Sequence, residues 1–141
     1  MPQGVRLLHL EGRVLLGTSL RSTLENARRD GALISIDLGG ADWIRARGGS
    51  KTAYQLATIQ PDILFAGQDS AAELGAPLEG VAKVPVLTLG AAGCAVYGRR
   101  LAAPAVEHLD PDALMAAFCV AFAGGAAPVE AAGRAVLVAA G

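Results

Sequence analysis

Short apolar runs alternate with helix-forming segments along the first two thirds of this 141-residue chain, and glycines follow most of them. The runs predict strands over residues 5–10, 32–38, 62–65 and 84–89. The intervening segments predict helices over residues 20–30, 50–59 and 69–74. Ser19 and Ser50 are the expected N-caps, and Gly31 and Gly75 the expected stop signals. Strand–helix–strand units favour parallel pairing, so the pattern predicts an α/β domain with a mainly parallel sheet.

The last third of the chain predicts a hairpin followed by two helices. The loop 90–93 leads from the fourth apolar run into residues 94–97, which favours an antiparallel hairpin, and residues 101–106 are expected to add an edge strand. Asp110 before Pro111 indicates a helix that ends at Gly124-Gly125, and Pro128 opens another. Because we find neither an internal repeat nor a long linker, we expect residues 1–141 to form one domain.

Composition excludes several classes of protein. Hydrophobic residues make up 52% of the chain, charged residues 18%, and the net charge is −1. These values argue against disorder and against an electrostatic nucleic-acid surface. No run is long enough to span a membrane, and the first residues do not resemble a signal peptide, so we expect a cytoplasmic protein without membrane or nucleic-acid partners. The two cysteines, Cys94 and Cys119, are expected to be buried and reduced, with no metal site.

Ligands of parallel α/β sheets bind beyond the carboxyl ends of the strands, which directs attention to the glycine-containing loops. Thr88 lies near the end of the fourth strand, and Gly90 and Gly93 follow it, where backbone N–H groups could approach an anion or a nucleotide. A tight hairpin also needs glycines, so both interpretations stay open. The segment 48–52 contains the Lys-Thr pair of a P-loop, but its spacing is wrong, and we expect a flexible loop and a helix cap there.

Acidic and histidine side chains offer weaker candidates for chemistry. Asp37 ends an apolar strand, where it could bind a ligand or cap a helix. Asp110 and Asp112 flank Pro111 and could form a catalytic pair, although helix capping is the stronger interpretation. His9 and His108 have no sequence neighbours that suggest catalysis, and we expect both to be structural.

The order of these segments resembles the C-terminal half of the ribokinase-like (PfkB) carbohydrate kinases. The resemblance rests on residues 9–12 (HLEG), 34–37 (ISID), 61–65 (PDILF), 86–96 (VLTLGAAGCAV) and 130–135 (EAAGRA). It implies a three-layer fold with helices on both faces of the sheet, a C-terminal hairpin and two closing helices. It also implies a truncated domain, because the chain begins where a full family member is about halfway through. The missing half would carry the lid and most contacts with the sugar.

Two family motifs are degenerate in this chain. Alignment on residues 62–65 places Gly67 and Ser70 where the family has the asparagine and glutamate that organise magnesium. Alignment on residues 117–118 retains the first aspartate of the family's anion-hole signature as Asp110. The loop glycines become Ala113 and Met115, and the catalytic base becomes Ala116. Alanine cannot accept a proton, and methionine crowds a loop where backbone must approach phosphate.

These departures favour a catalytically inactive kinase-like domain with a binding, regulatory or structural role. The alternatives are a minimal ATP-dependent sugar or nucleoside kinase in which Asp110 or Asp112 is a displaced base, and one half of a two-chain kinase. The residues themselves require no cofactor, and only the resemblance implies ATP, at Thr88, Gly90 and Gly93, and magnesium. The first strand should form an unpaired apolar edge, so we expect a homodimer, or a second chain that supplies the missing half.

Overall fold

The computed structural model describes residues 6–102 and 108–141, and it contains one six-stranded sheet whose strand order follows the chain. The strands are β1 (Leu7–Glu11), β2 (Leu33–Asp37), β3 (Ile63–Gly67), β4 (Val84–Thr88), β5 (Cys94–Val96) and β6 (Arg99–Leu101). The first four pair in parallel, and β5 and β6 add an antiparallel hairpin beside β4. The predicted mainly parallel sheet with a terminal hairpin is therefore confirmed.

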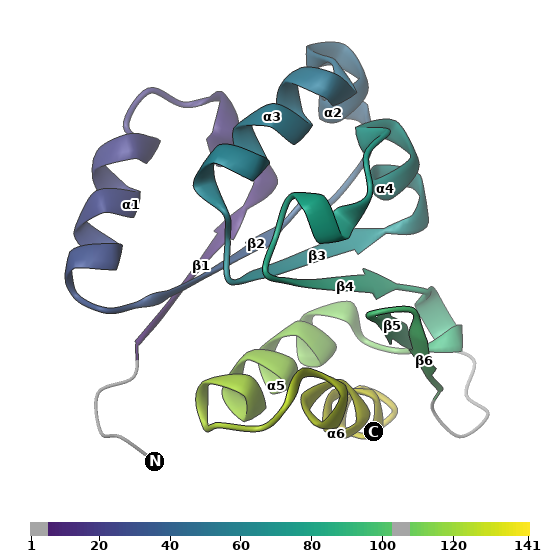
Figure 1. Ribbon diagram of the computed structural model, residues 1–141. Helices are drawn as coiled ribbons and strands as arrows, with labels where there is room; N and C mark the ends of the chain where they lie inside the picture. The colour runs from purple at the N-terminus through teal and green to yellow at the C-terminus, as the bar shows by residue number, and fades with distance from the viewer. Residues whose placement is uncertain (1–5, 103–107) are drawn as a thin grey trace.

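Helices cover both faces of the sheet, as expected for three layers (Figure 1). One face carries α1 (Leu20–Arg29), α2 (Asp42–Arg47), α3 (Gly49–Ile59) and α4 (Gln68–Leu74). The other face carries α5 (Pro111–Ala123) and α6 (Pro128–Ala139). Because side chains alternate along a strand, Leu64 and Ala66 face the first layer, whereas Ile63 and Phe65 face α5 and α6. Each face of the sheet thus has its own apolar core.

Small side chains build the layer of α5 and α6. Four alanines of α6 are buried, namely Ala131, Ala132, Ala135 and Ala139. They let α6 approach the sheet and α5 closely, because each adds only a methyl group to the contact. The larger volume in this core comes from Phe65 and Phe118, which are both fully buried. Of the helices that the structure describes, none is long and apolar enough to cross a membrane.

The helix α2 was not predicted from the sequence. It lies between two glycine pairs and buries Trp43 and Ile44. The indole Nε1 of Trp43 donates to the Leu38 carbonyl oxygen at 2.9 Å. The indole fits because residue 12 is glycine: a Cβ there would lie 2.6 Å from the Trp43 ring. This contact joins η1, the 3-10 turn Gly12–Leu16, to the end of β2.

Both predicted serine caps need correction. The helix α3 begins at Gly49 with Gly48 as its N-cap, so Ser50 lies inside the helix and does not cap it. Ser19 does precede α1, but its side chain makes no capping hydrogen bond. Its carbonyl oxygen instead accepts from the hydroxyls of Ser22 and Thr23. The P-loop-like segment is thus the start of a regular helix rather than a flexible loop.

The edge strand after residues 94–97 begins earlier than predicted. Tyr97 and Gly98 form a two-residue turn, and both have positive φ angles, of 51° and 77°. This geometry matches the right-handed twist of the flanking strands, so β6 begins at Arg99 and not at residue 101. Residues 103–106 of the expected edge strand, and residue 5 of the expected first strand, lie outside the described residues.

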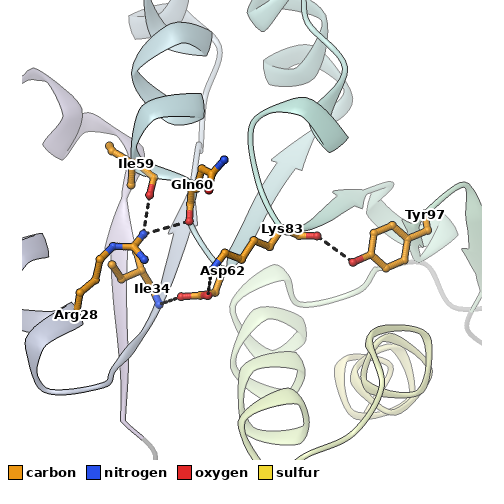
Figure 2. A network of polar contacts seen from close by, with 7 residues as sticks. All are labelled: Arg28, Ile34, Ile59, Gln60, Asp62, Lys83 and Tyr97. Carbon is orange, nitrogen blue, oxygen red and sulfur yellow. Dashed lines mark hydrogen bonds and ion pairs between the residues drawn. The ribbon is translucent and has the colours of Figure 1, made fainter.

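A polar network connects the amino ends of the parallel strands (Figure 2). It lies at the end of the strands opposite the glycine loops. Asp62 accepts from the Ile34 amide at 2.8 Å and pairs with the Lys83 ammonium at 3.3 Å. The Tyr97 hydroxyl donates to the Lys83 carbonyl oxygen, and Arg28 donates to the carbonyl oxygen of Ile59 at the end of α3. These hydrogen bonds satisfy backbone groups at the ends of strands and helices, so this end of the sheet has a structural role.

Candidate functional site

An open pocket of about 400 Å³ lies at the carboxyl ends of β2, β3 and β4. Glycine backbone forms much of its wall, at Gly39, Gly40, Gly67 and Gly90. Without Cβ atoms at these positions, a ligand can approach the main chain closely. The pocket volume lies within the range of small-molecule sites, and its place at the strand ends is where parallel sheets bind ligands.

A buried hydroxyl connects the start of α4 to the loop after β2, and both segments line this pocket. Ser70 of α4 is nearly inaccessible, and its hydroxyl donates to the carbonyl oxygen of Gly39. Thr88 donates in turn to the Ala66 carbonyl oxygen at 3.3 Å. The strand ends are therefore fixed by side chain–backbone bonds before any ligand arrives.

A smaller pocket of about 230 Å³ continues from Gly39-Gly40 towards the end of β1. Asp37 lies in its wall, and its carboxylate accepts from the Gly39 amide at 3.0 Å. Burial raises the pKa of the Asp37 carboxyl above its usual value. The nearby charges of Asp112 and Glu11 act in the same direction, whereas the Gly39 hydrogen bond and His9 lower the pKa. Asp37 thus supports the turn after β2 and also faces the pocket.

The three residues expected to contact a nucleotide do not lie together. Thr88 and Gly90 line the larger pocket, whereas Gly93 is not part of its wall. Gly93 is buried, with φ of 102°, and its carbonyl oxygen accepts from the Leu89 amide. A Cβ at Gly93 would lie 2.0 Å from the Leu101 carbonyl oxygen. The hairpin itself therefore requires this glycine.

The start of α5 stands where the family resemblance expects an anion hole and a base. The Asp110 carboxylate accepts from the amides of Asp112 and Ala113, at 3.0 and 3.4 Å. An acidic cap thus occupies the N–H groups that would otherwise face a phosphate. Met115 and Ala116 lie within the regular helix, and Ala116 carries no group that accepts a proton.

The helix cap can be tested by substitution. Asp110→Ala is expected to lower the free energy of unfolding by about 1 kcal/mol, because two amides of the first turn lose their acceptor. Asp110→Asn is the matched control and should be close to wild type, since asparagine caps as well as aspartate. Urea denaturation measures both changes. Equal destabilisation by the two variants would show that the carboxylate acts through its charge and not as a cap.

The residues present do not fit a protein-bound magnesium ion. Gly67 ends β3 and has no side chain, and the Ser70 hydroxyl is committed to Gly39. Within residues 6–102 and 108–141, no cluster of three or more histidine, cysteine, aspartate or glutamate side chains could hold a metal ion.

Sequence reasoning missed one polar chain. The imidazole Nδ1 of His9 lies 2.9 Å from the Ser35 hydroxyl, and the Cys119 thiol donates to the same oxygen at 3.7 Å. The signal that could have found it is register, because His9 and Ser35 stand opposite each other in β1 and β2. Ser35 is fully buried, so this chain of bonds is a packing contact between β1, β2 and α5.

Both thiols are poor nucleophiles. Burial raises the pKa of Cys94 to about 11. Burial also raises the pKa of Cys119, and the hydrogen bond with Ser35 lowers it in part. Both cysteines are free and buried, as predicted.

Solved structures of sugar kinases share this fold. A PfkB protein from a Polaromonas species is 25% identical, with a TM-score of 0.69 over 96% of this chain and 52% of that one. An uncharacterized sugar kinase from Pyrococcus horikoshii in complex with ATP is 19% identical, with a TM-score of 0.69 over 98% and 51%. Aminoimidazole riboside kinase from Salmonella enterica is 16% identical, with a TM-score of 0.68 over 96% and 56%. The chain thus has a ribokinase-like α/β fold.

The chain spans about half the length of these solved structures. No protein-family model matches the sequence. A comparison with curated proteins also finds no match.

Proposed function

We propose that this chain is a kinase-like domain that binds a nucleotide at the carboxyl ends of β2–β4 without transferring its phosphoryl group. The start of α5 carries the proposal. Phosphoryl transfer needs a base beside the nucleophile and stabilisation of the charge on the phosphoryl oxygens. Here Asp110 occupies the first amides of the helix, and the position expected to hold the base is Ala116.

The pocket at the strand ends supports the binding half of the proposal. Gly40 and Gly67 leave backbone accessible, and Thr88 and Gly90 form the rim nearest the hairpin. One structural neighbour with the same fold is solved in complex with ATP. The carboxylate of Asp69 also lines this pocket, so we expect weak nucleotide binding rather than tight capture of phosphate.

Calorimetry and a coupled assay together test the proposal. Titration with ATP or ADP up to millimolar concentration is expected to give saturable heat. The assay with ATP, magnesium and a panel of sugars and nucleosides is expected to show no turnover, with an active carbohydrate kinase as positive control. Robust phosphorylation that depends on this chain would contradict the proposed lack of phosphoryl transfer. Absence of saturable heat would contradict the proposed nucleotide binding.

A glycine variant should locate the binding site. Gly67 has a negative φ angle, and a Cβ there would meet only the Thr88 hydroxyl at 3.7 Å, so Gly67→Leu fills the pocket without backbone strain. We expect the affinity for nucleotide to fall at least about tenfold, which corresponds to about 1.4 kcal/mol. Gly80→Leu is the matched control, because its Cβ would meet open space and Gly80 is absent from that pocket wall. Equal affinities of the two variants would place the nucleotide elsewhere.

The alternative of an active sugar or nucleoside kinase has one observation in its favour. Asp112 is exposed and lines a groove together with His9 and Ala116, where a displaced base could reach a substrate. Asp110 is the weaker candidate because it is the helix cap. Turnover that disappears in Asp112→Asn and persists in Asp110→Asn would establish this alternative. Turnover that appears only after addition of a second polypeptide would establish the two-chain kinase.

A further inference from the structure

The outer edge of β1 carries unused hydrogen-bonding groups. The Leu33 amide donates to the Arg6 carbonyl oxygen, so even-numbered residues of this segment direct their backbone groups towards β2. Backbone groups alternate in direction along a strand, so the N–H and C=O groups of Leu7, His9 and Glu11 point away from the sheet. Among the described residues, only β2 pairs with β1.

The two edges of the sheet differ in their protection. At the opposite edge, β6 exposes Arg99 and Arg100 in a three-residue strand, and short charged strands resist pairing with other chains. The five residues of β1 include Leu7, Leu8 and Leu10. The edge at β1 is thus the longer and more apolar of the two.

An apolar groove of about 390 Å³ lies beside this edge, between β1 and α5. Leu7, Met115, Ala116 and Val120 form most of its wall, and Val120 is 75% exposed. Ala116 and Val120 also line an open groove of about 480 Å³ that continues to Val138 of α6. Asp112 is the single charged residue of α5, and a helix that is apolar on all sides is normally covered.

We propose that the β1 edge and the β1–α5 groove form a homodimer interface, in which two copies pair their β1 strands antiparallel about a two-fold axis at His9. This register places His9 opposite His9 of the second copy and Leu7 opposite Glu11 of the second copy. Every outward N–H and C=O group of both strands then has a partner. Glu11 also lies diagonal to His9 of the second copy, within reach of an ionic contact.

Symmetry explains why a second copy suits this surface. A two-fold axis perpendicular to the sheet keeps each face on the same side, so the two β1–α5 grooves come to lie next to each other across the joined edge. The exposed Val120 side chains can then bury apolar area against the second copy. The same short strand supplies donors and acceptors in complementary order, which is the requirement of an isologous contact. This inference does not depend on nucleotide binding.

Sedimentation and light scattering across micromolar concentrations test the interface. The wild-type protein is expected to have the mass of a dimer. His9→Pro removes the central outward N–H, and the exposed edge of a sheet tolerates proline. Val120→Asp places a charge in the groove from an exposed position, so it leaves the core intact. Both variants should have half the wild-type mass while their circular dichroism stays unchanged.

Tyr54→Asp is the matched control for Val120→Asp. Tyr54 lies on α3, on the other face of the sheet, and it is 78% exposed, so this variant should remain a dimer. Hydrogen exchange adds a second measurement, because the His9 amide should gain protection as protein concentration rises. A wild-type monomer would overturn the proposal, whether or not it assembles with a different polypeptide. A Val120→Asp protein that stays dimeric would overturn it too, even if His9→Pro fails to fold.

Discussion

Replacing Phe118 by alanine is expected to lower the free energy of unfolding by about 3–5 kcal/mol. Phe118 is fully buried, and its ring centroid lies 5.6 Å from that of Phe65 in an edge-to-face contact. This pair joins α5 to β3 at the centre of the core below the sheet. The alanine variant loses the apolar contact and leaves a cavity between rigid elements, which cannot close around it.

Phe122→Ala is the matched control. Its ring stacks on Phe118 at 6.0 Å, but the side chain is only half-buried, so its loss should cost at most about half as much. Denaturation by urea, with the slope compared between variants, measures both changes. A loss below about 1 kcal/mol for Phe118→Ala would mean that this core is loosely packed.

Gly93→Ala should be the most damaging glycine substitution in the hairpin, with an expected loss of about 2–5 kcal/mol. The positive φ angle of 102° is costly for alanine, and the new Cβ would lie 2.0 Å from the Leu101 carbonyl oxygen. Because the obstacle is backbone, β6 must shift to relieve the contact. The hydrogen bond from the Leu89 amide to Gly93 should weaken at the same time.

Gly98→Ala separates the two causes. Gly98 also has a positive φ angle, of 77°, but nothing lies within 4 Å of its added Cβ, so only backbone strain of about 1–2 kcal/mol is expected. Thermal and chemical denaturation measure both variants, and hydrogen exchange of the Leu89 amide reports on the hairpin. Equal losses of unfolding free energy for the two variants would show that β6 shifts away from the new Cβ at no cost in stability.

The strands and most helices could be predicted because their signals are local. Apolar runs such as residues 34–36 and 63–66 are stable in a small domain only when they are buried in its core. Asp110-Pro111 is a direct signal for the start of α5. The helix α2 could not be predicted in this way. Its Trp43 is buried only because Gly12, far away in the chain, leaves room for the ring.

The sequence predicted where the candidate pocket lies, but it did not predict all of the residues that line it. The strand-end rule led to Thr88 and Gly90, which do line the larger pocket. The same rule could not distinguish Gly93, since its role depends on the Leu101 carbonyl oxygen across the hairpin. The contact of His9 with Ser35 needed the register of β1 against β2, which no local pattern specifies.

The two cores on opposite faces of the sheet are completed at different times as the ribosome makes this chain. Residues between 10 and 82 form the core beneath α1–α4, whereas the other core waits for residues up to 140. Synthesis of the intervening residues takes on the order of seconds. During that interval Phe65, Val84 and Val86 line an uncovered apolar sheet face. The nascent protein therefore passes through a state in which one face of the sheet is still exposed. In this state, aggregation competes with the packing of α5 and α6.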